Sequence, residues 1–159
     1  MKAIIKTVFA VTVAALLYSC EKSKNFIEDS TISTGVGYFP ISNNTIQDFN
    51  ITPARTLSTT SGSATSYAGG AIIKAEVTFF SQSPVKETVL YNTIGTGTKT
   101  AVTTIPYTPS FSALKGVDTL MINYTVPTAP AANTVIRLDY EVVNENALKV
   151  VRTVYIRRT

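Results

Sequence analysis

Two carboxylates near the carboxyl end of the chain have a spacing that hydrolytic enzymes use. Asp139 and Glu141 lie two residues apart in the segment Thr134 to Val143, where apolar and polar residues alternate as in a strand. On a strand they share one face about 7 Å apart, which resembles the acid and base of an inverting glycosidase. They also alternate with Arg137 on the polar face, where charged residues are normally solvated. The pattern therefore favours solvated surface charge over a catalytic pair.

Cys20 is the single cysteine of the chain, and it directly follows an apolar run. The first six residues include Lys2 and Lys6, the residues from Thr7 to Leu17 are uncharged, and the chain reaches the cysteine as Leu-Tyr-Ser-Cys. A basic start, an apolar segment too short to span a bilayer and a small residue before the cysteine are typical of a bacterial lipoprotein signal peptide. We expect cleavage after Ser19 and acylation of Cys20, which would anchor the chain stably if two or more acyl chains are attached. The alternative is an ordinary signal peptide followed by an unpaired thiol.

Three tyrosines are candidates for contact with a ligand or a protein partner. Tyr67 and Tyr107 fall in predicted loops, and Tyr155 falls in the last predicted strand at a position that faces outward. Aromatic faces can pack on sugar rings, although exposed single aromatic residues are common on protein surfaces. Tyr124 and Tyr140 occupy apolar positions of their strands, so we expect these two in the core.

The composition removes several classes of site. The chain has no histidine, no tryptophan and one cysteine. Ser-His-Asp and Cys-His catalysis, zinc sites of histidine or thiolate, and a disulfide are therefore excluded. We expect no enzyme, no catalytic residue, no metal and no cofactor. Residues 1–19 carry two of the 14 basic and none of the 10 acidic residues, so the mature side-chain charge is only +2 and nucleic-acid binding is not expected.

The chain divides into a leader, a tether and one domain. Residues 1–19 are the predicted signal peptide, and residues 20–35 are the lipidated cysteine and a polar, flexible tether. Residues 36–159 are rich in β-branched and aromatic residues and long enough for one core. Stability must come from apolar packing, since no disulfide is available.

Alternating apolar and polar residues predict the strands of this domain. The segments are Ala71–Phe80, Val85–Ile94, Lys99–Ile105, Asp118–Val126, Thr134–Val143 and Leu148–Arg157, with a short edge strand at Val36–Ile41. In Val85–Ile94, the side with Val85, Val89 and Tyr91 is the apolar one, opposite Lys86, Thr88 and Asn92. Ser110–Gly116 is expected to be a helical turn or a tight crossover, and residues 42–69 give no clear element. The fold class is therefore predicted as all-β, an antiparallel β-sandwich whose last three strands form a meander.

The carboxyl half of the chain resembles an immunoglobulin-like domain. The resemblance lies in the order Asp118-Thr119-Leu120, Tyr124-Thr125-Val126-Pro127 and Leu138-Asp139-Tyr140-Glu141-Val142, followed by a terminal strand. With the leader ending in Leu-Tyr-Ser-Cys-Glu-Lys, the chain resembles the small immunoglobulin-like lipoproteins of Bacteroidetes-type bacteria. The amino-terminal domains of accessory lipoproteins in glycan-uptake systems have this layout. The immunoglobulin cysteine pair and core tryptophan are missing, so only the general sandwich carries over.

The resemblance implies a location and a function. It implies an outer-membrane lipoprotein, on the cell surface or on the periplasmic face, whose partners are the membrane and envelope proteins or a glycan. It also implies O-glycosylation at Ser30 and Thr119, which follow Asp29 and Asp118, although Asp118 also fits a turn residue that opens a strand. We expect a non-catalytic interaction or scaffold module. The alternatives are a small glycan-binding lipoprotein of a polysaccharide-uptake system and a subunit of a surface fibre.

Overall fold

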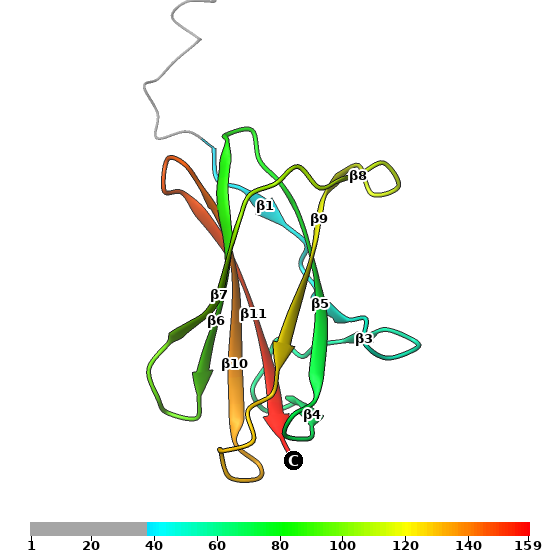
Figure 1. Ribbon diagram of the computed structural model, residues 1–159, viewed down its shortest axis with the longest axis vertical. Helices are drawn as coiled ribbons and strands as arrows, with labels where there is room; N and C mark the ends of the chain where they lie inside the picture. The colour runs from blue at the N-terminus through cyan, green and yellow to red at the C-terminus, as the bar shows by residue number, and fades with distance from the viewer. Residues whose placement is uncertain (1–37) are drawn as a thin grey trace, which may run out of the picture. The chain divides into compact units, whose positions relative to one another are not determined.

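The computed structural model describes residues 38–159, and they form two β-sheets with no helix (Figure 1). The prediction of an all-β fold is therefore confirmed for this part of the chain. The predicted signal peptide, Cys20, the tether and Ser30 lie outside the described residues. Within residues 38–159, no helix is long and apolar enough to cross a membrane.

Eleven strands follow one another along the described chain. They are β1 (Ile41–Ser42), β2 (Gln47–Asp48), β3 (Arg55–Thr56), β4 (Thr65–Tyr67), β5 (Ile72–Phe80), β6 (Val85–Ile94), β7 (Thr100–Pro106), β8 (Phe111–Ser112), β9 (Val117–Thr125), β10 (Val135–Asn144) and β11 (Lys149–Arg158). The six long strands lie where alternation predicts them, each shifted by no more than one residue at either end. Ser110–Gly116, predicted as a helical turn or a tight crossover, contains β8 and then a tight turn. In this turn the Gly116 N–H donates to the Ser112 carbonyl over 2.8 Å, which is the hydrogen bond of a single helical turn.

The first sheet has the strand order β3-β2-β5-β9-β8, and β1 also pairs with β5. Both β1 and β2 pair antiparallel with β5, Ile41 opposite Phe80 and Gln47 opposite Glu76. Asn43 fills the interruption between them. Its backbone N–H donates to the Thr78 carbonyl over 3.0 Å, and its side-chain Oδ1 accepts from the Thr78 N–H over 3.2 Å. The Asn43 side chain thus supplies a hydrogen bond to β5 between β1 and β2, where the backbone pairing with β5 is interrupted.

The second sheet has the order β4-β11-β10-β6-β7. All its pairs are antiparallel except β4 with β11, which is parallel, so the prediction of a purely antiparallel fold is corrected. The predicted three-strand meander is also wrong. β9 pairs with β5 in the first sheet, whereas β10 pairs with β6 and β11 in the second. Of the last three strands, only β10 and β11 form a hairpin, because the chain crosses between the sheets after Thr125.

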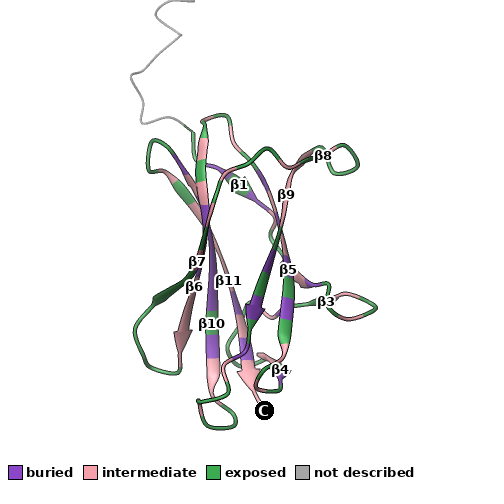
Figure 2. Cartoon of the chain, in the orientation of Figure 1, coloured by how far each residue is buried: buried purple, intermediate pink, exposed green. Residues whose placement is uncertain are grey.

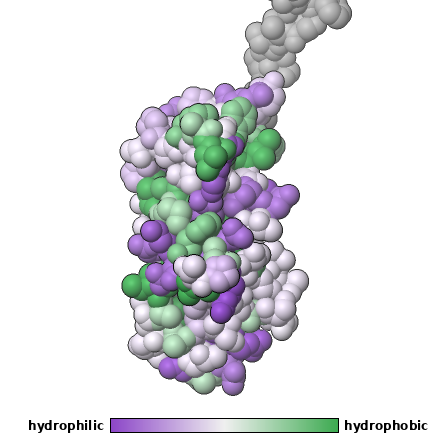
Figure 3. All heavy atoms as spheres, turned by 90° about the vertical axis from the view of Figure 1, so that its right-hand side faces the viewer, coloured by the Kyte–Doolittle hydropathy of each residue, from purple (hydrophilic) through white to green (hydrophobic). Residues whose placement is uncertain are grey.

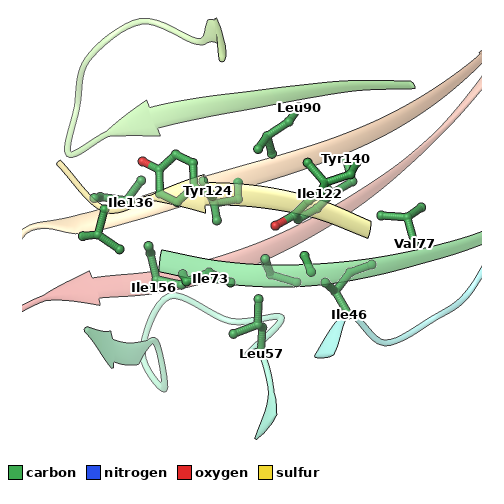
Figure 4. Packing of buried hydrophobic residues seen from close by; sticks show 14 of the residues in the cluster. Ile46, Leu57, Ile73, Val77, Leu90, Ile122, Tyr124, Ile136, Tyr140 and Ile156 are labelled. Atoms are coloured by element: carbon green, nitrogen blue, oxygen red, sulfur yellow. The ribbon is translucent and has the colours of Figure 1, made fainter. Parts of the chain in front are cut away.

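The two sheets pack face to face as a β-sandwich around one apolar core (Figures 2 and 4). Alternate side chains of β5, β9, β10 and β11 point into it, as the sequence pattern predicts. The core includes Ile73, Ala75, Val77, Phe79, Ile122, Tyr124, Ile136, Leu138, Tyr140, Val142, Val154 and Ile156. Ile46 and Leu57, from the segment without a predicted element, complete one side of the core.

One long strand faces the opposite way from its sequence pattern. β6 turns Thr88, Leu90 and Asn92 toward the first sheet, although this side carries more polar residues than the other. Leu90 is fully buried, and the Asn92 amide donates to the Tyr124 hydroxyl over 3.3 Å. The core therefore accepts a polar side chain here because the amide finds a hydrogen-bond partner inside it.

An arginine occupies a core-facing position of β11. Arg152 pairs with Tyr140 across the sheet, on the same face as Val154. Its guanidinium leaves the apolar region and donates to the carbonyls of Ser42 over 2.8 Å and Asn43 over 2.7 Å. In β11, the face that carries the valines and the isoleucine points into the core, as the sequence predicts. Arg152 connects this strand to the first sheet through its two hydrogen bonds.

Candidate functional site

The outer face of the second sheet carries a network of charged and aromatic side chains, which we call the charged face. It consists of Tyr91, Lys99, Arg137, Asp139, Glu141, Lys149, Thr153 and Tyr155. β10 contributes its alternating outward positions, as expected from strand geometry. Pairing then sets Tyr155 beside Arg137 on one side, and Tyr91 beside Asp139 on the other.

Asp139 is buried on this face, with 1% of its surface exposed, so the prediction of a solvated charge is wrong. Its Oδ1 accepts from the Thr153 hydroxyl over 2.6 Å and from Arg137 Nε over 2.8 Å, and its Oδ2 lies 3.3 Å from Lys99 Nζ. Burial alone would raise the pKa of Asp139. The hydrogen bonds from Thr153, Arg137 and Lys99 outweigh it and hold that pKa below its ordinary value.

Glu141 is buried in the same way, with 2% exposed, and the same correction applies. Its Oε1 pairs with Lys99, and its Oε2 accepts from Lys149 Nζ over 2.8 Å. Burial raises the pKa of Glu141, but the bonds from Lys149 and Lys99 overcome this effect and lower it. Lys99 and Lys149 place their ammonium groups on the carboxylates and stay partly exposed themselves, so the carboxylates on this outer face become buried beneath them.

The two carboxylates have a structural role in this arrangement. Both are held in the ionised form, so neither carries the proton that a glycosidase acid must donate at neutral pH. Among the described residues, no three His, Cys, Asp or Glu side chains gather as a metal site requires. The two carboxylates thus serve as acceptors that hold the cations of the charged face in place.

Cations and tyrosines form the outermost layer of the charged face. The side chains of Lys99, Arg137 and Lys149 are 40%, 47% and 52% exposed, above carboxylates that are 2% and 3% exposed. Lys99 Nζ also lies 4.3 Å from the centre of the Tyr91 ring. With three cations over two carboxylates, the face presents net positive charge flanked by aromatic rings.

Of the three candidate tyrosines, only Tyr155 lies on the charged face. It is half-buried beside Arg137, and its backbone N–H donates to the Ser58 carbonyl over 2.8 Å. Sequence reasoning did not select Tyr91 or Lys99 for this face. The signal for both was weak, because Lys99 reaches Glu141 only after the β6–β7 turn and the pairing of β10 bring them together.

Tyr67 is not an exposed loop residue, so this prediction is wrong. It belongs to β4, is 9% exposed, and its hydroxyl donates to Asp48 Oδ2 over 2.8 Å. Asp48 is itself fully buried, and its Oδ1 accepts from the backbone N–H groups of Asn50 and Lys74, each over 2.9 Å. Burial, followed by the bond to Asp48, raises the pKa of Tyr67. A ligand cannot reach this side chain.

Tyr107 follows β7 in a loop, as predicted, but its ring is partly covered. The ring packs edge-on against Phe79, with centres 6.3 Å apart, and its hydroxyl donates to Asp118 Oδ2 over 3.2 Å. Burial and this hydrogen bond raise the pKa of Tyr107. Tyr107 lines a cavity of about 370 Å³ at one end of the sandwich, away from the charged face.

Thr119 does not offer a hydroxyl for glycosylation in the folded domain. It lies inside β9 opposite Thr78, and its Oγ1 is buried without a hydrogen-bond partner among the described residues. The structure therefore contradicts the expectation of a modification site at Thr119. Asp118 accepts from the Ser110 N–H over 3.0 Å, which fits its alternative role as a residue that closes a turn before a strand.

Comparison with known proteins adds no family. Neither the protein-family models nor the curated proteins that were compared with the chain match it. The assignment of a function therefore depends on the geometry of the charged face and on the amino-terminal sequence.

Proposed function

We propose that this protein is a lipid-anchored, non-catalytic interaction module of the cell envelope, with the charged face as its binding surface. The main support is that buried Asp139 and Glu141 fix the positions of exposed Lys99, Arg137 and Lys149. Cations that are already ordered lose little side-chain entropy on binding. Arginine has five N–H donors and lysine three, more than the carboxylates take, so donors remain for an acidic partner.

We also propose that the sandwich is of the immunoglobulin-like type. The order β2-β5-β9-β8 corresponds to strands A, B, E and D of that fold, and β11-β10-β6-β7 corresponds to G, F, C and the strand after C. The missing cysteine pair and tryptophan are replaced by aliphatic and tyrosine packing. An experimental structure in which β9 and β10 lay in one sheet would contradict this assignment.

The anchor is tested by protease treatment of intact cells, comparing the wild-type chain with Cys20→Ala. We expect the wild-type protein in the membrane fraction with the mass of added acyl chains, and the variant released from it. Digestion of the wild-type protein from outside would support surface display, whereas protection would support the periplasmic face. If Cys20→Ala changed neither the mass nor the membrane association, the anchor would be rejected.

The binding surface is tested by photo-crosslinking in cells, with a photoreactive residue in place of Tyr155. We expect a specific adduct from this position and none from a matched position at Val102, which is 42% exposed on the edge strand β7. Adducts at neither position, or equal adducts at both, would count against the charged face.

A glycan is the second candidate partner, and one observation favours it. Tyr91 and Tyr155 stand on either side of the cations, so a chain of acidic sugars could stack on the rings while its carboxylates meet Lys99 and Arg137. Binding of polygalacturonate, measured by calorimetry, should then be lost in Lys99→Met with Tyr155→Ala, while Tyr107→Ala binds as before. Equal binding of uncharged dextran would contradict this version of the site.

A further inference from the structure

The end of the sandwich where the described chain begins exposes a group of large apolar side chains, which we call the apolar end. They are Tyr38 (65% exposed), Phe39 (65%), Ile41 (65%), Phe80 (50%), Phe111 (68%) and Leu114 (94%). They come from the segment before β1, from β1 itself, from the end of β5, from β8 and from the β8–β9 turn. Single exposed apolar residues are ordinary, but a contiguous group of this kind marks an interaction site.

Two adjoining depressions connect three of these residues, Ile41, Phe80 and Phe111. One has a volume of about 370 Å³ and is lined by Phe80, Pro84, Tyr107 and Phe111, among others. The second, of about 230 Å³, lies between β1 and β5 and shares Phe80 and Val117 with the first. In Figure 3, hydrophobic residues lie on the part of the surface near the start of the described chain, and further hydrophobic residues lie along the middle of the same face.

The start of the described chain is fastened to this same end. The Tyr38 N–H donates to Ser83 Oγ over 3.2 Å, and its carbonyl accepts from the Asn144 amide over 2.9 Å. Asn144 is fully buried and also donates to Ser81 Oγ over 2.9 Å. These bonds therefore fix Tyr38, the first described residue, at the apolar end.

The proposed anchor lies a short distance along the chain from Tyr38. Seventeen residues separate Cys20 from Tyr38. A linker of this length, flexible as the sequence predicts, would have a root-mean-square span of about 20–25 Å, less than the ~33 Å length of a ten-residue strand such as β10. An acylated Cys20 would thus hold the apolar end within reach of the bilayer, while the opposite end of the domain stays farther away.

We propose that the apolar end docks onto the lipid surface to which Cys20 is attached, with Leu114 and Phe111 entering the boundary between head groups and acyl chains. This inference rests on the proposed lipid anchor. Removal of these side chains from water supplies the driving force, and a tyrosine suits the interface because its ring is apolar and its hydroxyl is polar. The charges nearby have both signs, with Lys86 and Lys115 against Glu87 and Glu145, so the docking does not require anionic lipid.

The chain has no tryptophan, which makes a single introduced tryptophan a clean reporter. The full chain with Leu114→Trp, purified with its acyl chains, is placed in phosphatidylcholine vesicles with or without brominated acyl chains. Ala132→Trp is the matched control, since Ala132 is exposed in the β9–β10 loop at the opposite end of the domain (Figure 1). Phe111→Trp serves as a second reporter that conserves an aromatic side chain, and circular dichroism checks the fold of each variant.

We expect bromine to quench Leu114→Trp and Phe111→Trp several-fold more than Ala132→Trp, with emission shifted to shorter wavelength. If mass spectrometry shows an acylated Cys20 but quenching is weak or equal in all three variants, the docking is overturned and the proposed anchor stands. A blue shift without bromine quenching, together with a dimer mass, would show that a second copy covers the end and would also overturn the docking. An unacylated Cys20 would overturn both proposals.

Discussion

A carboxylate can remain charged beneath the outer face of a sheet when its neighbours supply enough donors. Asp139 has Thr153, Arg137 and Lys99 around it, and Glu141 has two lysines. Lys99 is shared by both carboxylates and is therefore the residue on which the network depends most. Removing it would leave each carboxylate with fewer partners but not alone.

Lys99→Met should lower the free energy of unfolding by about 1–2 kcal/mol, because two buried acceptors each lose a charged donor. Urea denaturation followed by circular dichroism measures this. The matched control is Lys86→Met, since Lys86 is 60% exposed and pairs over 3.3 Å with Glu87, whose side chain is more exposed than those of Asp139 and Glu141. A surface pair of this kind contributes about 0–1 kcal/mol. An equal loss in both variants would show that the buried network adds nothing specific.

The same network should make the protein sensitive to acid. The pKa values of Asp139 and Glu141 are lower in the folded chain than in the unfolded chain. As the pH falls below about 5, the unfolded chain takes up these protons first, so the free energy of unfolding declines. The contribution of these two carboxylates to the free energy of unfolding should be constant between neutral pH and the pH at which this decline begins. Lys99→Met should decline less steeply, and a decline as steep as in the wild-type chain would contradict the assignment.

Tyr67→Phe should cost about 1–3 kcal/mol in the free energy of unfolding, because it leaves one oxygen of the buried Asp48 carboxylate without a donor. Tyr107→Phe is the control, since it also removes one hydroxyl from an aspartate, but over 3.2 Å at a partly exposed site. Its loss should be smaller. Thermal or urea denaturation of the two variants measures these losses. A larger loss of unfolding free energy in Tyr107→Phe than in Tyr67→Phe would contradict the structural role of Tyr67.

The residue types of β10 predict which face of the strand Asp139 and Glu141 occupy, but they do not predict how deeply these two side chains are buried. Alternating residue types show which face of a strand a side chain lies on, but they do not show which neighbouring side chains cover it. The cover comes from Lys99 and Lys149, which only strand pairing brings near. Tyr67 shows the same limit: its partner Asp48 lies 19 residues away in a segment without a recognisable pattern.

At the level of strands, the interruption between β1 and β2 depends on one side chain. Asn43→Ala would remove the acceptor of the Thr78 N–H and the donor to the Glu76 carbonyl. We expect a loss of about 1–2 kcal/mol in the free energy of unfolding and faster hydrogen exchange at the Thr78 amide. The neighbouring exposed Asn44, replaced by alanine, is the control and should change neither. Unchanged exchange at Thr78 in Asn43→Ala would show that the backbone alone holds this edge.

Long strands were predictable and most short ones were not, for a physical reason. Among the short strands, only β1 was approached, because the predicted edge strand Val36–Ile41 overlaps it at Ile41. β5, β9 and β10 present four or more inward positions, enough for alternation to stand out. β2, β3 and β8 have two residues each and β4 has three, so no period can be seen in them. The predicted meander failed because the sequence does not say which strands pair, and the chain crosses to the other sheet after β9.

At the level of the whole molecule, one core holds both sheets together. Leu138 of β10 is fully buried between them. Leu138→Ala should cost about 2–5 kcal/mol, since the cavity it leaves cannot close without moving both layers. Val102→Ala, on the exposed edge strand β7, should stay within about 0.5 kcal/mol of the wild type.

Unfolding should also be cooperative between the sheets, because the inward side chains belong to a single cluster. Hydrogen exchange should give the amides of Val77 in β5 and Leu90 in β6 similar opening free energies, lowered together by Leu138→Ala. A drop confined to the second sheet would mean that the two layers unfold separately.

The parallel pairing of β4 with the end of β11 has a mechanical consequence. Tyr38 is fastened at one end of the sandwich, while Thr159 donates its backbone N–H to Tyr67 at the other end, over 2.8 Å. A pull between these two points runs along the strands and loads the hydrogen bonds on both sides of β11 in shear, all at once rather than one after another. A domain stretched between a membrane and a bound partner would therefore resist tension far better than a hairpin peeled from its open end.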